Sequence, residues 1–264
     1  MPKTRQKTRG IGKRFPTQRK TERKPKPEAK TVEQLQAEIT ALVDTAEQLM
    51  MKQPRQSFRL NNPYDFVPLD NAKREYSRLS WELERLMSDG QQPSYGDGET
   101  SKADQWREAT FTDPKGAVPR WSRRGSFILW MDYLPMLITW DGIFQPDMTA
   151  TAVDPKQSFI RDPQTTGRPS EVERARALPS AGYLGLGCWQ TITPKMNSVL
   201  DLVVSMIAEK SSNLMVRPMT EPAKQNVRDM LAAEPWIAEA LKRTPEHRLP
   251  MPRHLAAIQQ TLFG

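Results

Sequence analysis

The chain is poor in the residue types on which most catalytic and metal sites depend. Its 264 residues include one cysteine, Cys188, and two histidines, His247 and His254. A single cysteine forms no internal disulfide, which suits a reducing compartment, and too few ligands remain for a zinc site. We therefore expect no metal, no cofactor and no enzymatic activity. An enzyme that acts on nucleic acid is the least favoured alternative.

Long hydrophobic runs are also missing. The longest apolar stretch, Phe127 to Phe144, is interrupted by Asp132, Pro135 and Asp141. A membrane-spanning helix needs about 18 or more apolar residues in succession, so no membrane span is predicted. The amino end lacks the apolar core of a secretory signal. We expect an intracellular protein, inside the virion if it is viral, and not a secreted one.

Acidic residues are scarce in residues 1–30, where twelve lysines and arginines face two glutamates and the net charge is +10. The whole chain has 39 basic and 31 acidic residues, so the other 234 residues hold 27 and 29, a net charge of −2. Large apolar side chains in the segment are limited to Met1, Ile11 and Phe15, and four prolines interrupt any helix. Such a segment buries too little apolar surface to offset the entropy of ordering. The sequence therefore predicts a disordered basic arm over residues 1–30.

The cations of this arm favour a polyanion as partner. Basic side chains that contact phosphates release condensed counterions, so we expect binding that weakens steeply with salt. A mitochondrial targeting peptide is the main alternative, although the prolines prevent an amphipathic helix. The predicted nucleic-acid-binding residues of the arm are Lys3, Arg5, Lys7, Arg9, Lys13, Arg14, Arg19, Lys20, Arg23 and Lys24.

Residues 31–53 show the periodicity of an amphipathic helix. Thr31 and Gln34 form a capping box at its start, and the apolar positions alternate in steps of three and four. This heptad pattern, over about three heptads, is typical of parallel two-stranded coiled coils. The residues predicted to mediate oligomerisation are Val32, Leu35, Ile39, Leu42 and Leu49.

A second helix is predicted over residues 71–87. Its apolar stripe consists of Ala72, Tyr76, Leu79, Leu83 and Leu86. Trp81 lies off this stripe, and we expect it to pack on the body of the protein. Two arrangements of the region 31–88 remain open: an antiparallel hairpin within one chain, or helices that pair with copies from other chains. The glycine-rich residues 89–104 are predicted to be a flexible linker.

Residues 105–264 are predicted to form a globular, mainly helical domain, because they hold six of the seven tryptophans and several helix-start signals. Helices are expected after Thr193-Pro194, from Thr220, from Pro235 and after Pro252. Residues 127–140 fit either a helix broken near Pro135 or two short strands. Residues 143–180 are predicted to be a long irregular excursion. The expected fold is thus mainly α: a basic arm, a heptad-patterned helical pair and a compact tryptophan-rich helical body.

One segment of the body combines arginines with aromatic residues. Arg120, Trp121, Arg123 and Arg124 precede Phe127, and guanidinium groups grip phosphates while an aromatic ring can stack on an unpaired base. We predict these four residues as a second nucleic-acid contact. The alternative is that the rings of Trp121 and Phe127 are core anchors and the arginines form a solvated rim.

Two other motifs give weaker evidence of function. The run Gly182–Gly187 lacks the Gly-Lys-Ser/Thr ending of a phosphate loop and is interpreted as a turn. Asp132, Asp141, Asp147 and Asp154 match no known metal-ligand spacing.

Together these patterns predict a structural protein that packages or coats nucleic acid, with RNA slightly favoured over DNA. Its arm would neutralise phosphates and its helices would mediate homo-oligomerisation, as in nucleocapsid or coat proteins. Two alternatives stay open: a DNA-binding accessory or partition factor dimerised by a coiled coil, and an organellar ribosome-associated protein.

Overall fold

A computed structural model describes residues 30–52, 56–62, 64–88, 100–154, 157–161, 183–185, 191–210, 214–218 and 221–250. The chain divides into two units, residues 1–31 and residues 32–264, and nearly all described residues belong to the second. The disordered arm predicted over residues 1–30 lies outside the described residues except for Lys30, so it stays a prediction.

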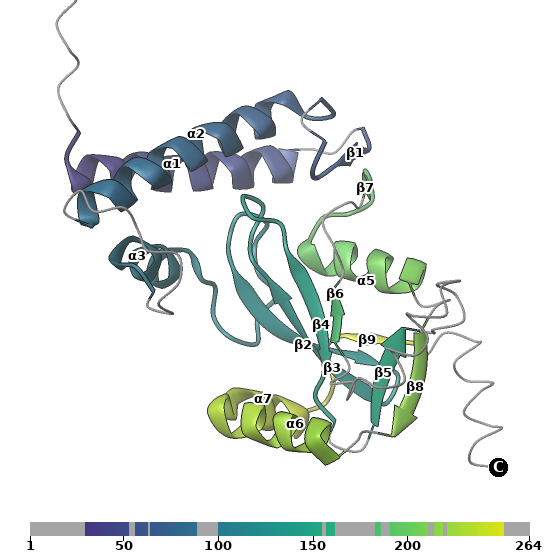
Figure 1. Ribbon diagram of the computed structural model, residues 1–264. Helices are drawn as coiled ribbons and strands as arrows, with labels where there is room; N and C mark the ends of the chain where they lie inside the picture. The colour runs from purple at the N-terminus through teal and green to yellow at the C-terminus, as the bar shows by residue number, and fades with distance from the viewer. Residues whose placement is uncertain are drawn as a thin grey trace, which may run out of the picture. The chain divides into compact units, whose positions relative to one another are not determined.

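The described part contains six helices and nine strands, arranged as in Figure 1. The helices are α1 (Val32–Lys52), α2 (Val67–Met87), α3 (Lys102–Phe111), α5 (Val199–Lys210), α6 (Glu221–Ala233) and α7 (Pro235–Leu241). The strands are β1 (Phe58–Arg59), β2 (Gly125–Met131), β3 (Leu134–Trp140), β4 (Met148–Ala152), β5 (Gln157–Arg161), β6 (Tyr183–Gly185), β7 (Thr191–Ile192), β8 (Leu214–Pro218) and β9 (Arg248–Leu249). The prediction of a mainly α fold is therefore confirmed only in part.

Helices α1 and α2 form an antiparallel hairpin within the chain (Figure 1). Leu35 and Ile39 of α1 are fully buried in one apolar cluster with Leu79 and Leu83 of α2. Both helices were predicted from their periodicity, and α2 begins four residues earlier than expected, at Val67. Trp81 does not pack on the body as expected, because 65 % of it is exposed.

Helix α3 begins inside the segment predicted to be a linker. The hydroxyl of Ser101 caps it by accepting a hydrogen bond from the backbone nitrogen of Asp104 at 3.0 Å. Ala103 and Phe111 are buried against the α1–α2 hairpin, which joins this short helix to the same apolar cluster. The helical residues 102–104 thus belong to the packed structure, while residues 89–99 lie outside the described part.

A five-stranded sheet forms the centre of the body, with the strand order β6-β4-β3-β2-β9. Strands β2 and β3 pair antiparallel through a two-residue turn, Asp132-Tyr133, in which Asp132 has a φ of 56°. Positive φ at this position is typical of tight hairpin turns, and aspartate tolerates it better than most residues. Residues 127–140 therefore form two strands, which is one of the two arrangements expected for them, and the expectation of a mainly helical body is confirmed only in part.

Pro135 does not prevent this pairing. It stands opposite Trp130, one position beyond the residues that close the hairpin. Alternate pairs in an antiparallel ladder exchange no hydrogen bonds, so the missing N–H of proline costs no bond to β2. The backbone nitrogen of Trp130 instead donates to the carbonyl oxygen of His247 at 2.9 Å, on the β9 side.

The remaining elements surround this sheet. Helices α6 and α7 begin close to the predicted starts at Thr220 and Pro235. Helix α5 begins later than predicted, at Val199, where the hydroxyl of Ser198 accepts a hydrogen bond from the backbone nitrogen of Asp201. Strands β4 and β5 lie within residues 143–180, so this region is not wholly irregular. The helix predicted after Pro252 lies outside the described residues.

The largest apolar cluster connects the sheet with the end of the hairpin. It contains Trp121 and Trp140 from the sheet side, Ala46 and Met50 from α1, and residues of α5 and α6. The hairpin is therefore packed on the sheet through a shared core. Among the described residues, none of the helices combines the length and the apolar character that crossing a membrane requires.

Candidate functional site

Several predicted site residues cannot be placed. The ten cationic residues of the arm predicted to bind nucleic acid, Cys188 and His254 all lie outside the described residues. Within the described ranges, no three His, Cys, Asp or Glu side chains come together as potential metal ligands.

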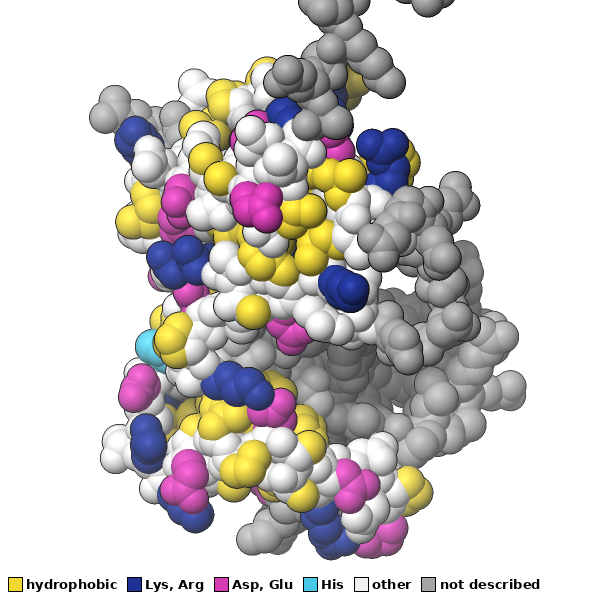
Figure 2. Space-filling view, turned by 90° about the vertical axis from the view of Figure 1, so that its left-hand side faces the viewer, with side chains coloured by type: hydrophobic (Ala, Val, Ile, Leu, Met, Phe, Trp, Pro, Cys, Tyr) yellow, Lys and Arg dark blue, Asp and Glu magenta, His cyan; other side chains and the backbone are white. Residues whose placement is uncertain are grey.

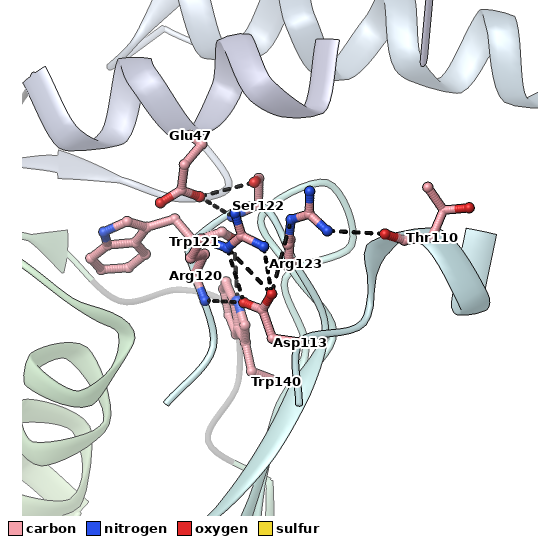
Figure 3. Close-up of polar contacts among 8 residues, drawn as sticks. All are labelled: Glu47, Thr110, Asp113, Arg120, Trp121, Ser122, Arg123 and Trp140. Atoms are coloured by element: carbon pink, nitrogen blue, oxygen red, sulfur yellow. Dashed lines mark hydrogen bonds and ion pairs between the residues drawn. The ribbon is translucent and has the colours of Figure 1, made fainter. Parts of the chain in front are cut away.

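The predicted arginine–aromatic segment lies between α3 and β2, where Figure 3 shows its contacts. Trp121 is 1 % exposed, and Phe127 is fully buried. The backbone oxygen of Trp121 accepts a hydrogen bond from Nε1 of Trp140 at 3.2 Å. The stacking role expected for Trp121 is therefore contradicted, because its ring is enclosed by the core and offers no face to a base.

The arginines of this segment contact one buried carboxylate. Asp113 accepts hydrogen bonds from the backbone nitrogen of Arg120 at 2.8 Å and from its Nη2 at 2.7 Å. Arg123 donates to the carbonyl oxygen of Thr110 at 2.9 Å, and its Nε lies 4.0 Å from Asp113. Burial opposes ionisation of Asp113, but the hydrogen bonds from Arg120 and the charge of Arg123 outweigh it and lower the pKa of Asp113.

Helix α1 contacts the same segment through Glu47. Its Oε2 accepts hydrogen bonds from both the backbone nitrogen and the hydroxyl of Ser122, as Figure 3 shows. Hydrogen bonds to a charged carboxylate are among the stronger ones in proteins. Residues 120–124 thus connect the hairpin, the end of α3 and the sheet, which is a structural role.

Two of the arginines keep accessible guanidinium groups. Arg120 is 54 % exposed at its side chain despite the ion pair with Asp113. Arg124 donates to the side-chain oxygen of Gln145 at 3.0 Å in an exposed contact. Nearby, burial raises the pKa of Asp141, with a further contribution from Asp147, while the charge of Arg124 opposes the shift. A phosphate contact at Arg120 and Arg124 stays a prediction.

The residues predicted to mediate oligomerisation lie largely inside the chain. Leu35 and Ile39 are fully buried, and Val32 and Leu42 pack partly buried against the same cluster. Leu49 is half-buried. Contact with another chain through this stripe would require the hairpin to open, so an oligomer of the folded protein needs a different surface.

The body contains a hollow that the sequence did not reveal. It has a volume of about 350 Å³ and lies between α7, β2 and the segment before β9. In Figure 2 the described histidine lies at the left-hand edge of the molecule, and the face shown exposes apolar side chains among basic and acidic ones. The residues that line the hollow are Lys115, Gly116, Ile128, Trp130, Trp236, Glu239, Ala240, Arg243, Thr244, Pro245, Glu246 and His247.

Trp236 is held firmly in the wall of this hollow. Its Nε1 donates to Oε2 of Glu234 at 2.9 Å, and the same oxygen accepts a hydrogen bond from Nζ of Lys115 at 2.5 Å. Gly116 has a φ of +90°, and a Cβ placed there would lie 3.7 Å from the indole ring. The ring is thus fixed by a hydrogen bond at its edge and by backbone packed against it.

His247 is fixed on the opposite side. Its ring meets Phe127 edge-on, with centroids 6.0 Å apart and an interplanar angle of 87°. His247 and Trp236 both lie in the body, and no pattern in the sequence connects them with one site. The one sequence signal for the hollow was the occurrence of tryptophans near cationic residues, which is too common in proteins to identify a site.

Comparisons of this chain with protein-family models, with curated proteins and with solved structures found no match.

Proposed function

We propose that this chain is a structural nucleic-acid-binding protein that coats or packages nucleic acid. Residues 1–30 hold the phosphates, and the folded body supplies contacts along the polymer. One observation carries the proposal: the net charge is +10 in residues 1–30 and −2 in the remaining 234 residues. Cations gathered on one segment allow condensation of a polyanion without strong repulsion between the bodies of neighbouring copies.

The described part of the body supports this separation of charge, because many of its basic side chains form ion pairs with acidic side chains of the same body. The arginines and lysines that form ion pairs there come from α2, α3, α6, β9 and the loops, including the residue that follows α7. The pairs are Arg74–Asp70, Arg78–Glu75, Arg107–Glu84, Lys115–Glu234, Arg120–Asp113, Lys224–Glu221, Lys242–Glu239 and Arg248–Asp132. Polyanion attraction is therefore assigned to the amino-terminal segment.

Single-stranded RNA is the favoured polymer. Proteins that read a DNA major groove usually insert a basic helix. None of the six described helices has a net positive charge; α2, the most basic, carries four basic and four acidic residues. Binding through a flexible arm without a groove-reading helix suits a flexible strand better than a duplex.

The test compares the natural chain with a variant in which the twelve arm cations are replaced by glutamine at unchanged length. Affinity for single-stranded RNA and for duplex DNA is measured by fluorescence anisotropy at several salt concentrations. We expect the variant to lose most of its affinity for both and to keep its circular dichroism spectrum. Equal affinity of the two proteins would contradict the proposal.

The packaging proposal is tested by the size of the particles that the purified protein forms. Purified protein is passed through a sizing column, and the 260/280 nm absorbance ratio is recorded before and after nuclease treatment. Large particles that collapse with nuclease support a coat. A small defined dimer that prefers DNA would support instead a DNA-binding accessory factor and contradict the packaging proposal.

A further inference from the structure

The hollow between Trp130 and Trp236 has the composition of a site for a planar ring. We infer that it binds one unpaired nucleobase of the strand that the arm holds, an assignment that rests on the proposed function. The indole rings of both tryptophans are half-buried, so each keeps an accessible part. Ile128, which is 9 % exposed, supplies an apolar wall from β2.

The size of the hollow fits this occupant. Its volume of about 350 Å³ lies at the lower end of the range for small-molecule pockets, roughly 300–1,000 Å³. A nucleobase stacks on an aromatic side chain without regard to its sequence identity, because every base has a π face. A site of this kind therefore adds affinity for unpaired strands without selecting one sequence, which is what a coat requires.

The walls are arranged before any ligand arrives. Glu234 accepts hydrogen bonds from both Trp236 and Lys115, and the backbone of Gly116 packs on the indole ring. Trp130 is anchored by its backbone hydrogen bond to His247. Side chains that are already fixed lose little conformational entropy when a ligand binds. The ring of Trp236 is therefore a preorganised stacking surface, and the strand that carries Trp130 is fixed beside it.

Charges around the hollow distinguish the base from its phosphate. Glu239 and Glu246 line the hollow and would repel a phosphate placed inside it, but carboxylates accept hydrogen bonds from exocyclic amino groups of bases. The carboxylate of Glu239 is also held by Lys242 at 2.7 Å. Arg243 lines the hollow and has no ion-pair partner within the described ranges, which leaves it available to the phosphate that follows the base.

A methylated ammonium group is the other ligand that favours tryptophan walls. Lys115 and Arg243 both line the hollow, and their positive charges oppose such a cation. The same charges favour a ligand that carries phosphate next to its ring. The lining as a whole holds two carboxylates and two cations, so its net charge does not choose between the two ligands. Arg243, which has no ion-pair partner within the described ranges, is the group that favours the nucleotide.

The test uses the full chain and two probes of equal length and charge: a short single-stranded oligonucleotide and the corresponding abasic strand. Two substitutions change the hollow, Trp236→Ala and Arg243→Gln. Each has a matched control outside the proposed stacking surface: Trp81→Ala removes an exposed tryptophan of α2, and Lys242→Gln removes the neighbouring cation. Circular dichroism verifies that each variant is folded, and Trp236→Phe retains a ring should Trp236→Ala unfold.

We expect Trp236→Ala to weaken binding of the base-bearing strand about tenfold and to leave binding of the abasic strand unchanged. Trp81→Ala should change neither. Arg243→Gln should weaken binding of the base-bearing strand severalfold more than Lys242→Gln does. Trp236→Phe should keep most of the preference for the base-bearing strand.

Two contrary outcomes are distinguishable. If the natural chain binds both strands equally and Trp236→Ala changes nothing, the base site is refuted, while loss of binding in the arm-neutralised variant would still support the proposed function. If the natural chain binds neither strand, the proposed function fails and the base site fails with it.

Discussion

Glu47 on α1 accepts two hydrogen bonds from Ser122, a residue 75 positions later in the chain. The donors are the backbone nitrogen at 2.8 Å and the hydroxyl at 2.9 Å. One carboxylate therefore binds the loop that leads into β2 to the last part of α1. Because the contact joins two distant parts of the chain, its loss should weaken the packing between them.

We expect Glu47→Ala to lower the free energy of unfolding by about 2 kcal/mol, since it leaves two donors without their charged acceptor. Urea denaturation of the two proteins measures the difference. The control is Asp44→Ala, which removes an exposed carboxylate one turn earlier on α1 and should change stability by less than about 0.5 kcal/mol. Equal effects of the two substitutions would show that the contact with Ser122 contributes nothing.

Asp113 should make the stability depend on pH in the acid range. Because the folded protein lowers the pKa of Asp113 below its usual value of 3.8, the stabilising contribution of the carboxylate is present above that value. The contribution is lost as the pH falls through the lowered pKa. We expect Asp113→Asn to cost about 1–2 kcal/mol at neutral pH, and the difference from the natural chain to shrink on acidification.

The matched control for this prediction is Glu221→Gln, at a fully exposed carboxylate whose pKa is lowered by the hydrogen bond from Lys224. Its effect at neutral pH should be smaller than that of Asp113→Asn, because solvent screens exposed pairs. Thermal unfolding between acid and neutral pH measures both. A difference that stays constant with pH would contradict the role given to the Asp113 carboxylate.

Leu83 and Trp81 are two positions apart on α2 and point to opposite environments. Leu83 is fully buried in the hairpin cluster, whereas Trp81 is 65 % exposed. Leu83→Ala should therefore destabilise the protein by about 2–5 kcal/mol, and Trp81→Ala by no more than about 0.5 kcal/mol. Guanidinium denaturation measures both losses of stability. The reverse order would mean that α2 buries the face that carries Trp81.

The salt dependence of nucleic-acid binding should scale with the number of arm cations. Replacing four of them, Lys3, Arg5, Lys7 and Arg9, by glutamine should reduce the slope of log affinity against log salt by about 3 on a single strand. Replacing four cations of the body, Arg74, Arg78, Lys224 and Lys242, should change the slope much less, because each is paired with an acid. Equal changes would argue against a dedicated arm.

The sequence predicted the helices of the hairpin well because periodicity is a local property. The spacing of the apolar residues along α1 and α2 can be read from the sequence without knowing the surface on which they pack. The strands β2 and β3 were harder to predict, since a continuous apolar run fits a buried strand and a buried helix equally. Asp132 was the available signal: it separates two runs of equal length and favours a tight turn.

The candidate sites were less predictable, for a related reason. Trp130 and Trp236 are more than one hundred residues apart, and only the packing of α7 against the sheet brings them to one hollow. Trp121 was predicted as a nucleic-acid contact because of its arginine neighbours, with a core anchor as the alternative. The alternative holds for the ring, which is 1 % exposed, while the side chain of Arg120 is 54 % exposed. The sequence shows which residues are neighbours along the chain, but it does not show which way each side chain points.

The central sheet ends on both sides in very short strands, β6 with three residues and β9 with two. A long exposed strand edge invites pairing with another molecule. Strand β9 covers only Trp130 and Met131 of β2, but the backbone nitrogen of Gly116 donates to the carbonyl oxygen of Ser126 at 2.8 Å and covers a further part of this edge. A protein that accumulates along a polymer meets its own copies at high local concentration. Sheet edges that are short or covered would let those copies lie close together and remain folded, instead of pairing through their strands into fibres.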